Sequence, residues 1–191
     1  MPVTTLDPKT ALVVIDLQNG VAALPGEPYS TAEVINRTVE LADAFRKHDL
    51  PVVLVRVSFA ADGSDRLPGR TELQRRTGTP TANSAEIVDQ LAGHPEDIIV
   101  TKRNWGAFYG TDLDLQLRRR GVTQVVLTGI ATSIGVESTA RAAHEHGYHL
   151  SLVTDAMADR SAEDHRHAVE RVFPRVGECG TTAELLALLR G

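Results

Sequence analysis

Polar side chains follow the apolar runs of this sequence, at the points where those runs end. Asp16 follows the first run, Lys102 the third, the segment Gly129–Gly135 with Thr132 and Ser133 the fourth, and Asp155 the fifth. A carboxylate held near an ammonium can donate or accept a proton, because each group changes the pKa of the other. These residues predict acid–base chemistry, provided that the fold brings them to one place.

The apolar runs predict β-strands, because they are short and rich in β-branched residues. The predicted strands are Ala11–Ile15, Val52–Val57, Ile98–Val100, Val125–Leu127, Leu150–Val153 and a short sixth one near Val176–Cys179. The predicted helices are Thr31–His48, Ala85–Leu91, Leu113–Arg120, Gly135–His146, Ala162–Phe173 and Ala183–Leu189. Apolar strands that alternate with amphipathic helices are typical of a parallel sheet covered on both faces. We predict an α/β fold, a three-layer αβα sandwich with a mostly parallel, roughly six-stranded central sheet.

Local signals mark the ends of several helices. Two segments, Ser30–Glu33 and Thr181–Glu184, have the spacing of a capping box, in which the side chains at both ends satisfy helix N-terminal amides. Gly121 and Gly147 stand where a helix commonly ends in a left-handed glycine.

In an open α/β sheet, ligands bind beyond the carboxyl ends of the strands, where the loops diverge and helix N-termini point inward. One long segment, Phe59–Asn83, lacks clear periodicity and is rich in glycine, proline, threonine and arginine. Loops of this length usually have a function. We interpret the segment as an insertion over one end of the sheet.

Composition excludes several classes of protein. The 191 residues are 42% hydrophobic, which is enough for a buried core, and we expect a single domain over residues 1–191. The net charge of −5 gives no electrostatic reason to expect nucleic acid or an anionic membrane as a partner. With one cysteine, the chain can form neither an internal disulfide nor a multi-cysteine zinc site. No run is long enough to span a bilayer and no signal-peptide pattern opens the chain, so we expect a cytoplasmic location.

Four motifs, in order along the chain, resemble the isochorismatase-like hydrolase superfamily. They are Ala11–Gln18, Thr101–Leu113, Thr128–Arg141 and Val153–Ala156. Each motif is weak alone, but four of them at the family's spacing on a matching βα pattern are a strong signal. The resemblance implies an Asp–Lys–Cys triad, in which Asp16 and Lys102 match the first two members. Gly135 falls where the nucleophilic cysteine normally stands.

The resemblance therefore implies a reaction without a nucleophile from the protein. Glycine has no side chain to attack an amide carbon, which disfavours the usual cysteine route. Isochorismatases of this superfamily also carry glycine at this place, and they cleave a vinyl ether. We predict hydrolysis of isochorismate or a similar small carboxylated enol ether, with Asp16 as general acid. Lys102 either orients Asp16 or binds a substrate carboxylate. Burial raises the pKa of Asp16 and Lys102 lowers it, and the sequence leaves open which effect is larger.

Other residues are predicted to contact the substrate. They are Gln18, Trp105, Phe108, Ala131, Thr132 and Ile134. Gln18 alternatively supports the loop of Asp16. A dianionic substrate needs a cation for its second carboxylate, and the long loop offers four arginines, Arg66, Arg70, Arg75 and Arg76. The resemblance also implies a cis peptide bond near Ile130–Ala131 and a homodimer or higher homo-oligomer.

Two other functions stay open at this point. Asp16 acting as a base could activate water against a small amide or ester, or the chain could be a pseudoenzyme that binds a metabolite without turnover. The remaining candidates have structural interpretations. Asp155 and Cys179 are predicted to be structural, and the two histidine pairs, His144/His146 and His165/His167, to lie on the surface. We expect no cofactor and no bound metal.

Overall fold

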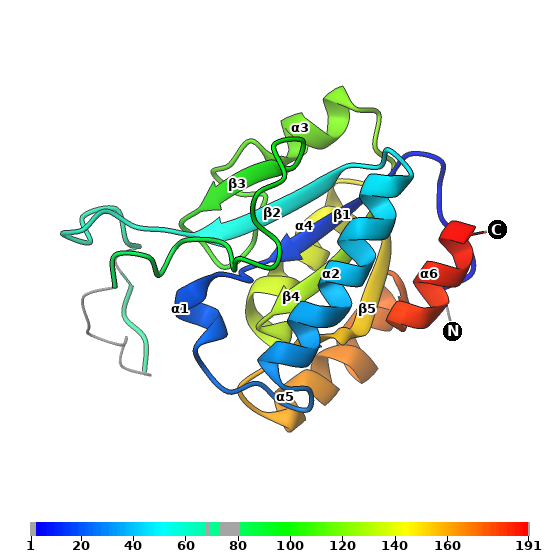
Figure 1. Cartoon of the computed structure of the whole chain (residues 1–191). Helices are drawn as coiled ribbons and strands as arrows, with labels where there is room; N and C mark the ends of the chain where they lie inside the picture. The colour runs from blue at the N-terminus through cyan, green and yellow to red at the C-terminus, as the bar shows by residue number, and fades with distance from the viewer. Residues whose placement is uncertain (1–2, 68, 73–80, 191) are drawn as a thin grey trace.

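A six-stranded, fully parallel sheet forms the centre of the protein (Figure 1). The computed structural model describes residues 3–67, 69–72 and 81–190. The strand order is β3-β2-β1-β4-β5-β6. The strands are β1 (Thr10–Ile15), β2 (Val52–Val57), β3 (Ile98–Lys102), β4 (Gln124–Ile130), β5 (His149–Ala158) and β6 (Glu178–Gly180). The predicted strands and sheet are thereby confirmed, with β5 longer than expected at its carboxyl end.

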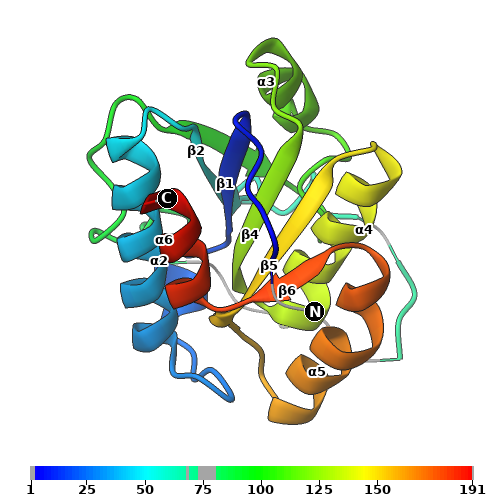
Figure 2. The same cartoon turned by 90° about the vertical axis from the view of Figure 1, so that its right-hand side faces the viewer.

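Helices cover both faces of the sheet, which gives the three predicted layers (Figure 2). The α-helices are α1 (Asn19–Ala22), α2 (Thr31–Lys47), α3 (Leu113–Arg119), α4 (Glu137–Glu145), α5 (Ala162–His167) and α6 (Thr182–Arg190). Shorter turns are the π-helical η1 (Thr132–Val136) and η2 (Ala168–Val172) and the 3₁₀ turn η3 (Phe173–Arg175). Side chains of α2 and α6 pack on one face, and those of α3, α4 and η2 pack on the other.

The alternation of side chains along β1 explains why both faces need a cover. Leu12 and Val14 pack under α2, whereas Val13 and Ile15 pack under the opposite helices. All four side chains are fully or almost fully buried. Each such burial stabilises the fold by about 1.5–3 kcal/mol relative to an exposed side chain.

Among the described residues, no helix is long and apolar enough to cross a membrane.

The predicted helix Ala85–Leu91 is wrong. Residues 84–88 instead pair antiparallel with the chain that follows β1, through bonds from Asn19 N to Glu86 O and from Val88 N to Leu17 O, 2.9 and 3.1 Å long. Val88 and Leu91 are buried. Hydrogen bonds to the backbone near Leu17 and Asn19 replace the hydrogen bonds of a helix. The local sequence pattern of residues 85–91 does not predict such pairing.

The helix predicted at Gly135–His146 begins earlier, at Thr132, with the π-helical turn η1. Asp155 also differs from the prediction, because it lies within β5 rather than after it. The capping boxes are confirmed at both places, and Gly121 and Gly147 have the expected positive φ values of 68° and 82°.

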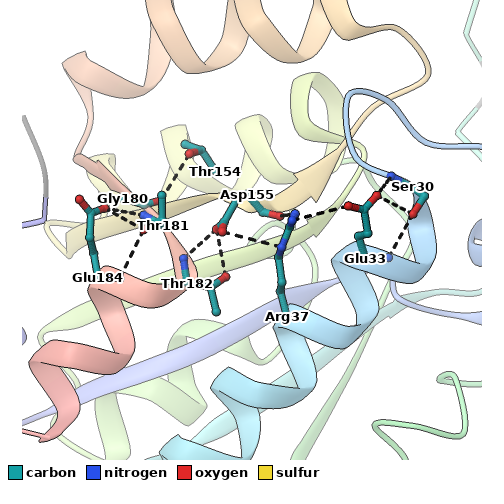
Figure 3. Close-up of polar contacts among 9 residues, drawn as sticks. All are labelled: Ser30, Glu33, Arg37, Thr154, Asp155, Gly180, Thr181, Thr182 and Glu184. Carbon is teal, nitrogen blue, oxygen red and sulfur yellow. Dashed lines mark hydrogen bonds and ion pairs between the residues drawn. The ribbon is translucent and has the colours of Figure 1, made fainter.

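Asp155 joins three elements on one side of the sheet (Figure 3). Its Oδ1 accepts hydrogen bonds from the backbone N–H and the hydroxyl of Thr182, at 2.7 and 3.0 Å, and so caps the start of α6. Its Oδ2 lies 3.8 Å from Nε of Arg37 on α2. Asp155 therefore has the structural role that the sequence analysis predicted for it.

We expect Asp155→Ala to lower the free energy of unfolding by about 1–2 kcal/mol, because the N-terminal amide of α6 loses its acceptor and Arg37 loses one of its two carboxylate partners. Urea titration monitored by circular dichroism measures this change. Asp155→Asn keeps one acceptor and should lose less. An equal loss in both variants would contradict the capping role.

Candidate active site

The predicted acid and the predicted cation lie at the carboxyl edge of the sheet, on either side of β2. Asp16 directly follows β1, and Lys102 is the last residue of β3. Nζ of Lys102 lies 2.8 Å from Oδ2 of Asp16, so the lysine side chain reaches across the end of β2. These two residues, 86 positions apart in the sequence, form one ion pair.

The backbone around Asp16 depends on a close approach between β1 and β4. Gly129 has a φ of 118°, and a Cβ at this position would lie 2.1 Å from the carbonyl oxygen of Ile15. Only glycine fits there. Asp16 itself has a φ of 54°, an uncommon value for a residue with a side chain. Such backbone conformations cluster at functional sites.

Burial dominates the electrostatics of the Asp16–Lys102 pair. Asp16 is 7% exposed and Lys102 is 2% exposed. Desolvation raises the pKa of Asp16 to about 6, and the nearby Lys102 ammonium opposes this rise without cancelling it. Nζ of Lys102 also donates to the carbonyl oxygen of Trp105 at 2.6 Å. The balance that the sequence left open therefore favours a raised pKa, which keeps part of the Asp16 population protonated near neutral pH.

The second oxygen of Asp16 has no partner among the described residues. Oδ1 is buried and accepts no hydrogen bond, whereas Oδ2 is occupied by Lys102. A buried acceptor without a partner costs about 1–3 kcal/mol. A ligand group that forms a hydrogen bond with Oδ1 removes this cost.

Gly135 lies next to both members of the Asp16–Lys102 ion pair. A Cβ built on Gly135 would lie 3.4 Å from Oδ2 of Asp16, 3.5 Å from Nζ of Lys102 and 3.0 Å from a methyl carbon of Ile15. A side chain here would fill the space next to both charged groups. The absence of one leaves that space to a ligand.

Several buried groups hold the turn that carries Gly135. The backbone N–H of Ser133 donates to Oδ2 of Asp159 at 2.6 Å, and the hydroxyl of Thr132 lies 2.9 Å from Nδ1 of His165. The hydroxyl of Thr139 donates to the carbonyl oxygen of Gly135 at 2.7 Å. These contacts fix the turn relative to β5 and α5.

The prediction that His165 lies on the surface is wrong, because this side chain is buried, and burial lowers its pKa. Its neighbour in the pair, His167, is exposed. The π-helical continuation η2 and the bond to Thr132 account for the difference, and both depend on tertiary packing. The peptide bond between Ile130 and Ala131 is cis, as the resemblance implied.

A cavity of about 890 Å³ opens above the ion pair. This volume suits a small organic molecule. The lining combines apolar and charged side chains from the ends of β1 to β5 and from the long loop. Its residues are Asp16, Val21, Val57, Phe59, Arg66, Leu67, Thr71, Glu72, Lys102, Arg103, Asn104, Trp105, Ile130, Ala131, Ile134, Gly135 and Arg160.

Three of the predicted substrate contacts line this cavity and three do not. Trp105, Ala131 and Ile134 line it, and Trp105 is 69% exposed. Thr132 is buried behind the cavity against His165. Gln18 and Phe108 also lie outside the lining.

Gln18 instead supports the loop of Asp16, as its alternative interpretation held. Its side-chain amide donates to the carbonyl oxygens of Val57 and Ser84, at 2.9 and 3.0 Å, and accepts from the N–H of Val57 at 2.7 Å. Phe108 belongs to the core, where its ring stacks on His146 at 4.9 Å. The sequence alone does not determine whether an aromatic side chain after a strand end faces the core or a cavity.

Of the two arginines of the long loop that the structure describes, one lines the cavity. Arg66 lines it, whereas Arg70 is exposed outside the lining. Arg75 and Arg76 lie outside the described residues. The sequence analysis missed Arg160, because a single arginine after a strand carries no local signal of its direction.

Cys179, the one cysteine of the chain, is half-buried in β6 and does not line the cavity. Burial raises the pKa of its thiol, which disfavours the nucleophilic thiolate. In the part of the chain that the structure describes, no three histidine, cysteine or carboxylate side chains gather closely enough to hold a metal ion.

Comparisons with known proteins find one family along nearly the whole chain. The isochorismatase domain model matches residues 10–184. YwoC, an uncharacterized isochorismatase family protein of Bacillus subtilis (strain 168), is 47% identical over 180 residues, 93% of each chain. The solved structure of an isochorismatase family protein from Burkholderia thailandensis is 45% identical, with a TM-score of 0.95 over 98% of each chain. The ureidoacrylate amidohydrolase RutB of Methylobacterium radiotolerans is 32% identical over 87% of this chain and 74% of its own.

Proposed function

The chain belongs to the isochorismatase family, and from this premise we propose that it hydrolyses the vinyl ether of isochorismate or of a similar small carboxylated enol ether. The observation that carries the proposal is the state of Asp16. This carboxyl group lines the cavity, is buried, has a pKa raised to about 6 and keeps one oxygen without a partner among the described residues. A carboxylic acid of this kind can serve as a general acid near neutral pH.

In the proposed reaction, protonated Asp16 transfers its proton to the methylene carbon of the enol ether. The electron pair of the carbon–carbon double bond forms the new C–H bond, which leaves an oxocarbenium ion at the ether carbon. Water adds to this carbon, and the proton that water releases returns to Asp16. The resulting hemiketal collapses to pyruvate and the free alcohol, so that the net reaction consumes one water.

Lys102 and Gly135 have distinct roles in this proposal. Proton transfer leaves Asp16 as a carboxylate beside the oxocarbenium intermediate. The ammonium of Lys102, 2.8 Å from Oδ2, stabilises this carboxylate. Since Lys102 already contacts Asp16 and the carbonyl oxygen of Trp105, we assign it to orienting Asp16 rather than to binding a substrate carboxylate. Gly135, which the sequence resemblance places where members with a cysteine mechanism carry their nucleophile, leaves room for the substrate in this proposal.

A second candidate is hydrolysis of a small amide by water that Asp16 activates as a base. The 32% identity to a ureidoacrylate amidohydrolase favours it. Gly135 offers no nucleophile, so water has to attack directly. This candidate needs ionised Asp16, whereas the enol ether reaction needs protonated Asp16.

The pH dependence separates the two candidates. With a pKa of about 6, the protonated fraction of Asp16 falls about tenfold per pH unit above pH 6. We expect kcat/KM for isochorismate, followed by pyruvate release, to be highest below pH 6 and to fall with this slope above it. A base mechanism gives the opposite sign, a rise through pH 6 to a plateau.

The same assay, run with isochorismate, a simpler enol ether and ureidoacrylate, tests the substrate class. Turnover of the amide alone would overturn the proposal in favour of the second candidate. Tight binding without turnover of any of them would favour a metabolite-binding protein. The cytoplasmic location and the homo-oligomeric state stay predictions from the sequence.

A further inference from the structure

The cavity is lined by four basic side chains and by two carboxylates, Asp16 and Glu72, so positive charge exceeds negative charge. Lys102 is paired with Asp16, and Arg103 is paired with Asp65. Two further arginines in the lining, Arg66 and Arg160, form no ion pair with any described residue. Unpaired guanidinium groups attract anions, and the attraction is stronger for the half-buried Arg66 than for Arg160, because water screens the exposed Arg160.

Arg66 is held in place before any ligand arrives. Its guanidinium carbon lies 4.8 Å from the centre of the Phe59 ring, a stacking arrangement that orients the planar group. Its Nε is buried and has no hydrogen-bond partner among the described residues. A buried donor without an acceptor is costly, and a ligand oxygen removes that cost. Arg66 therefore has the geometry of an anion-binding residue.

Arg160 reaches the same cavity from a different element. It follows Asp159, and its backbone N–H donates to Oδ1 of Asp159 at 2.7 Å, which ties the residue to the anchored turn of Gly135. No described residue forms a hydrogen bond or an ion pair with its side chain. Its guanidinium is available to a ligand.

The sheet places these two arginines on opposite sides of the reactive pair. Arg66 belongs to the loop after β2, and Arg160 follows β5. In the strand order, β1 and β4 lie between β2 and β5, and they carry Asp16 and Gly135 at their carboxyl ends. Both side chains line the same cavity of about 890 Å³, a volume that accommodates a compound with a six-membered ring.

We propose that the cavity selects substrates with two acidic groups, one bound by Arg66 and the other by Arg160, with the reacting bond between them above Asp16. The inference rests on the proposed function for the identity of that bond. The binding itself does not depend on turnover. The two planar guanidinium groups favour carboxylates, which they can bind in bidentate fashion.

Unreactive acids test the proposal by calorimetry. The probes are benzoate, with one carboxylate, and benzene-1,3-dicarboxylate and benzene-1,4-dicarboxylate, each with two. We expect at least one diacid to bind wild type more than tenfold more tightly than benzoate. Arg66→Gln and Arg160→Gln should each weaken diacid binding by about tenfold to a hundredfold, the usual effect of losing a charged hydrogen bond. Lysine at either position keeps the charge but not the planar group, and should give an intermediate loss.

Arg141→Gln is the matched control, because Arg141 lies on α4 outside the cavity and is paired with Glu137. Thermal unfolding shows that each variant is folded. Equal affinity of wild type for benzoate and both diacids would overturn the proposal, as would unchanged diacid affinity in both glutamine variants. A diacid preference without enol ether hydrolysis would refute the proposed function alone. Turnover without any diacid preference would refute this inference alone.

Discussion

Asp16→Asn is expected to lower kcat/KM for isochorismate by about 10²- to 10⁴-fold, the usual contribution of a positioned general acid. Asparagine keeps the size and polarity of protonated Asp16 but has no acidic proton to transfer. The side chain is buried beside Lys102, so solvent cannot easily replace the lost donor. The loss should appear mainly in kcat, because proton transfer occurs after binding. Pyruvate release below pH 6, where wild type is most active, measures it.

Asp155→Asn is the control for this variant. It removes a carboxylate from another strand of the same sheet, also paired with a basic residue, but outside the cavity. Its kcat/KM should stay within about twofold of wild type. The substitution Asp16→Asn leaves the Lys102 ammonium buried without its carboxylate partner, which destabilises the fold. Thermal unfolding therefore has to show that the variant is folded at the assay temperature. A folded Asp16→Asn protein with wild-type kcat/KM would refute acid catalysis by Asp16.

Lys102→Met should lower kcat by about 10²-fold or more and also move the pH profile. Without the ammonium, the carboxylate that forms during proton transfer loses its stabilising charge. The same change removes the interaction that holds down the pKa of Asp16, so this pKa rises further. The falling limb of the profile should move to higher pH by roughly one to three units. Residual activity would then extend to a higher pH than in wild type.

The change in KM distinguishes two roles of Lys102, because the pH limb moves in both. If Lys102 orients Asp16, KM changes little. If Lys102 also binds a substrate carboxylate, KM rises strongly. Lys47→Met, on the exposed surface of α2, should change neither quantity.

The sequence predicted the sheet well, because two-sided burial leaves a strong local pattern. Runs such as Ala11–Ile15 and Val52–Val57 are apolar at nearly every position, and a strand with helices on both faces needs this pattern. Capping boxes and terminal glycines were equally local, since they satisfy backbone groups within a few residues. The helix expected at Ala85–Leu91 was wrong because its backbone groups found partners near Asn19, far away in the sequence.

The sequence by itself determined which residue types stand at the strand ends, and with them the candidates Asp16, Lys102 and Gly135. Tertiary structure alone decided how those residues act on one another. The pKa of Asp16 depends on how completely the fold removes water from it, because desolvation there outweighs the Lys102 charge. The directions of Phe108, into the core, and of Arg66, into the cavity, depend on packing between distant elements. Burial and distance are properties of the folded chain, and the linear order of residues does not contain them.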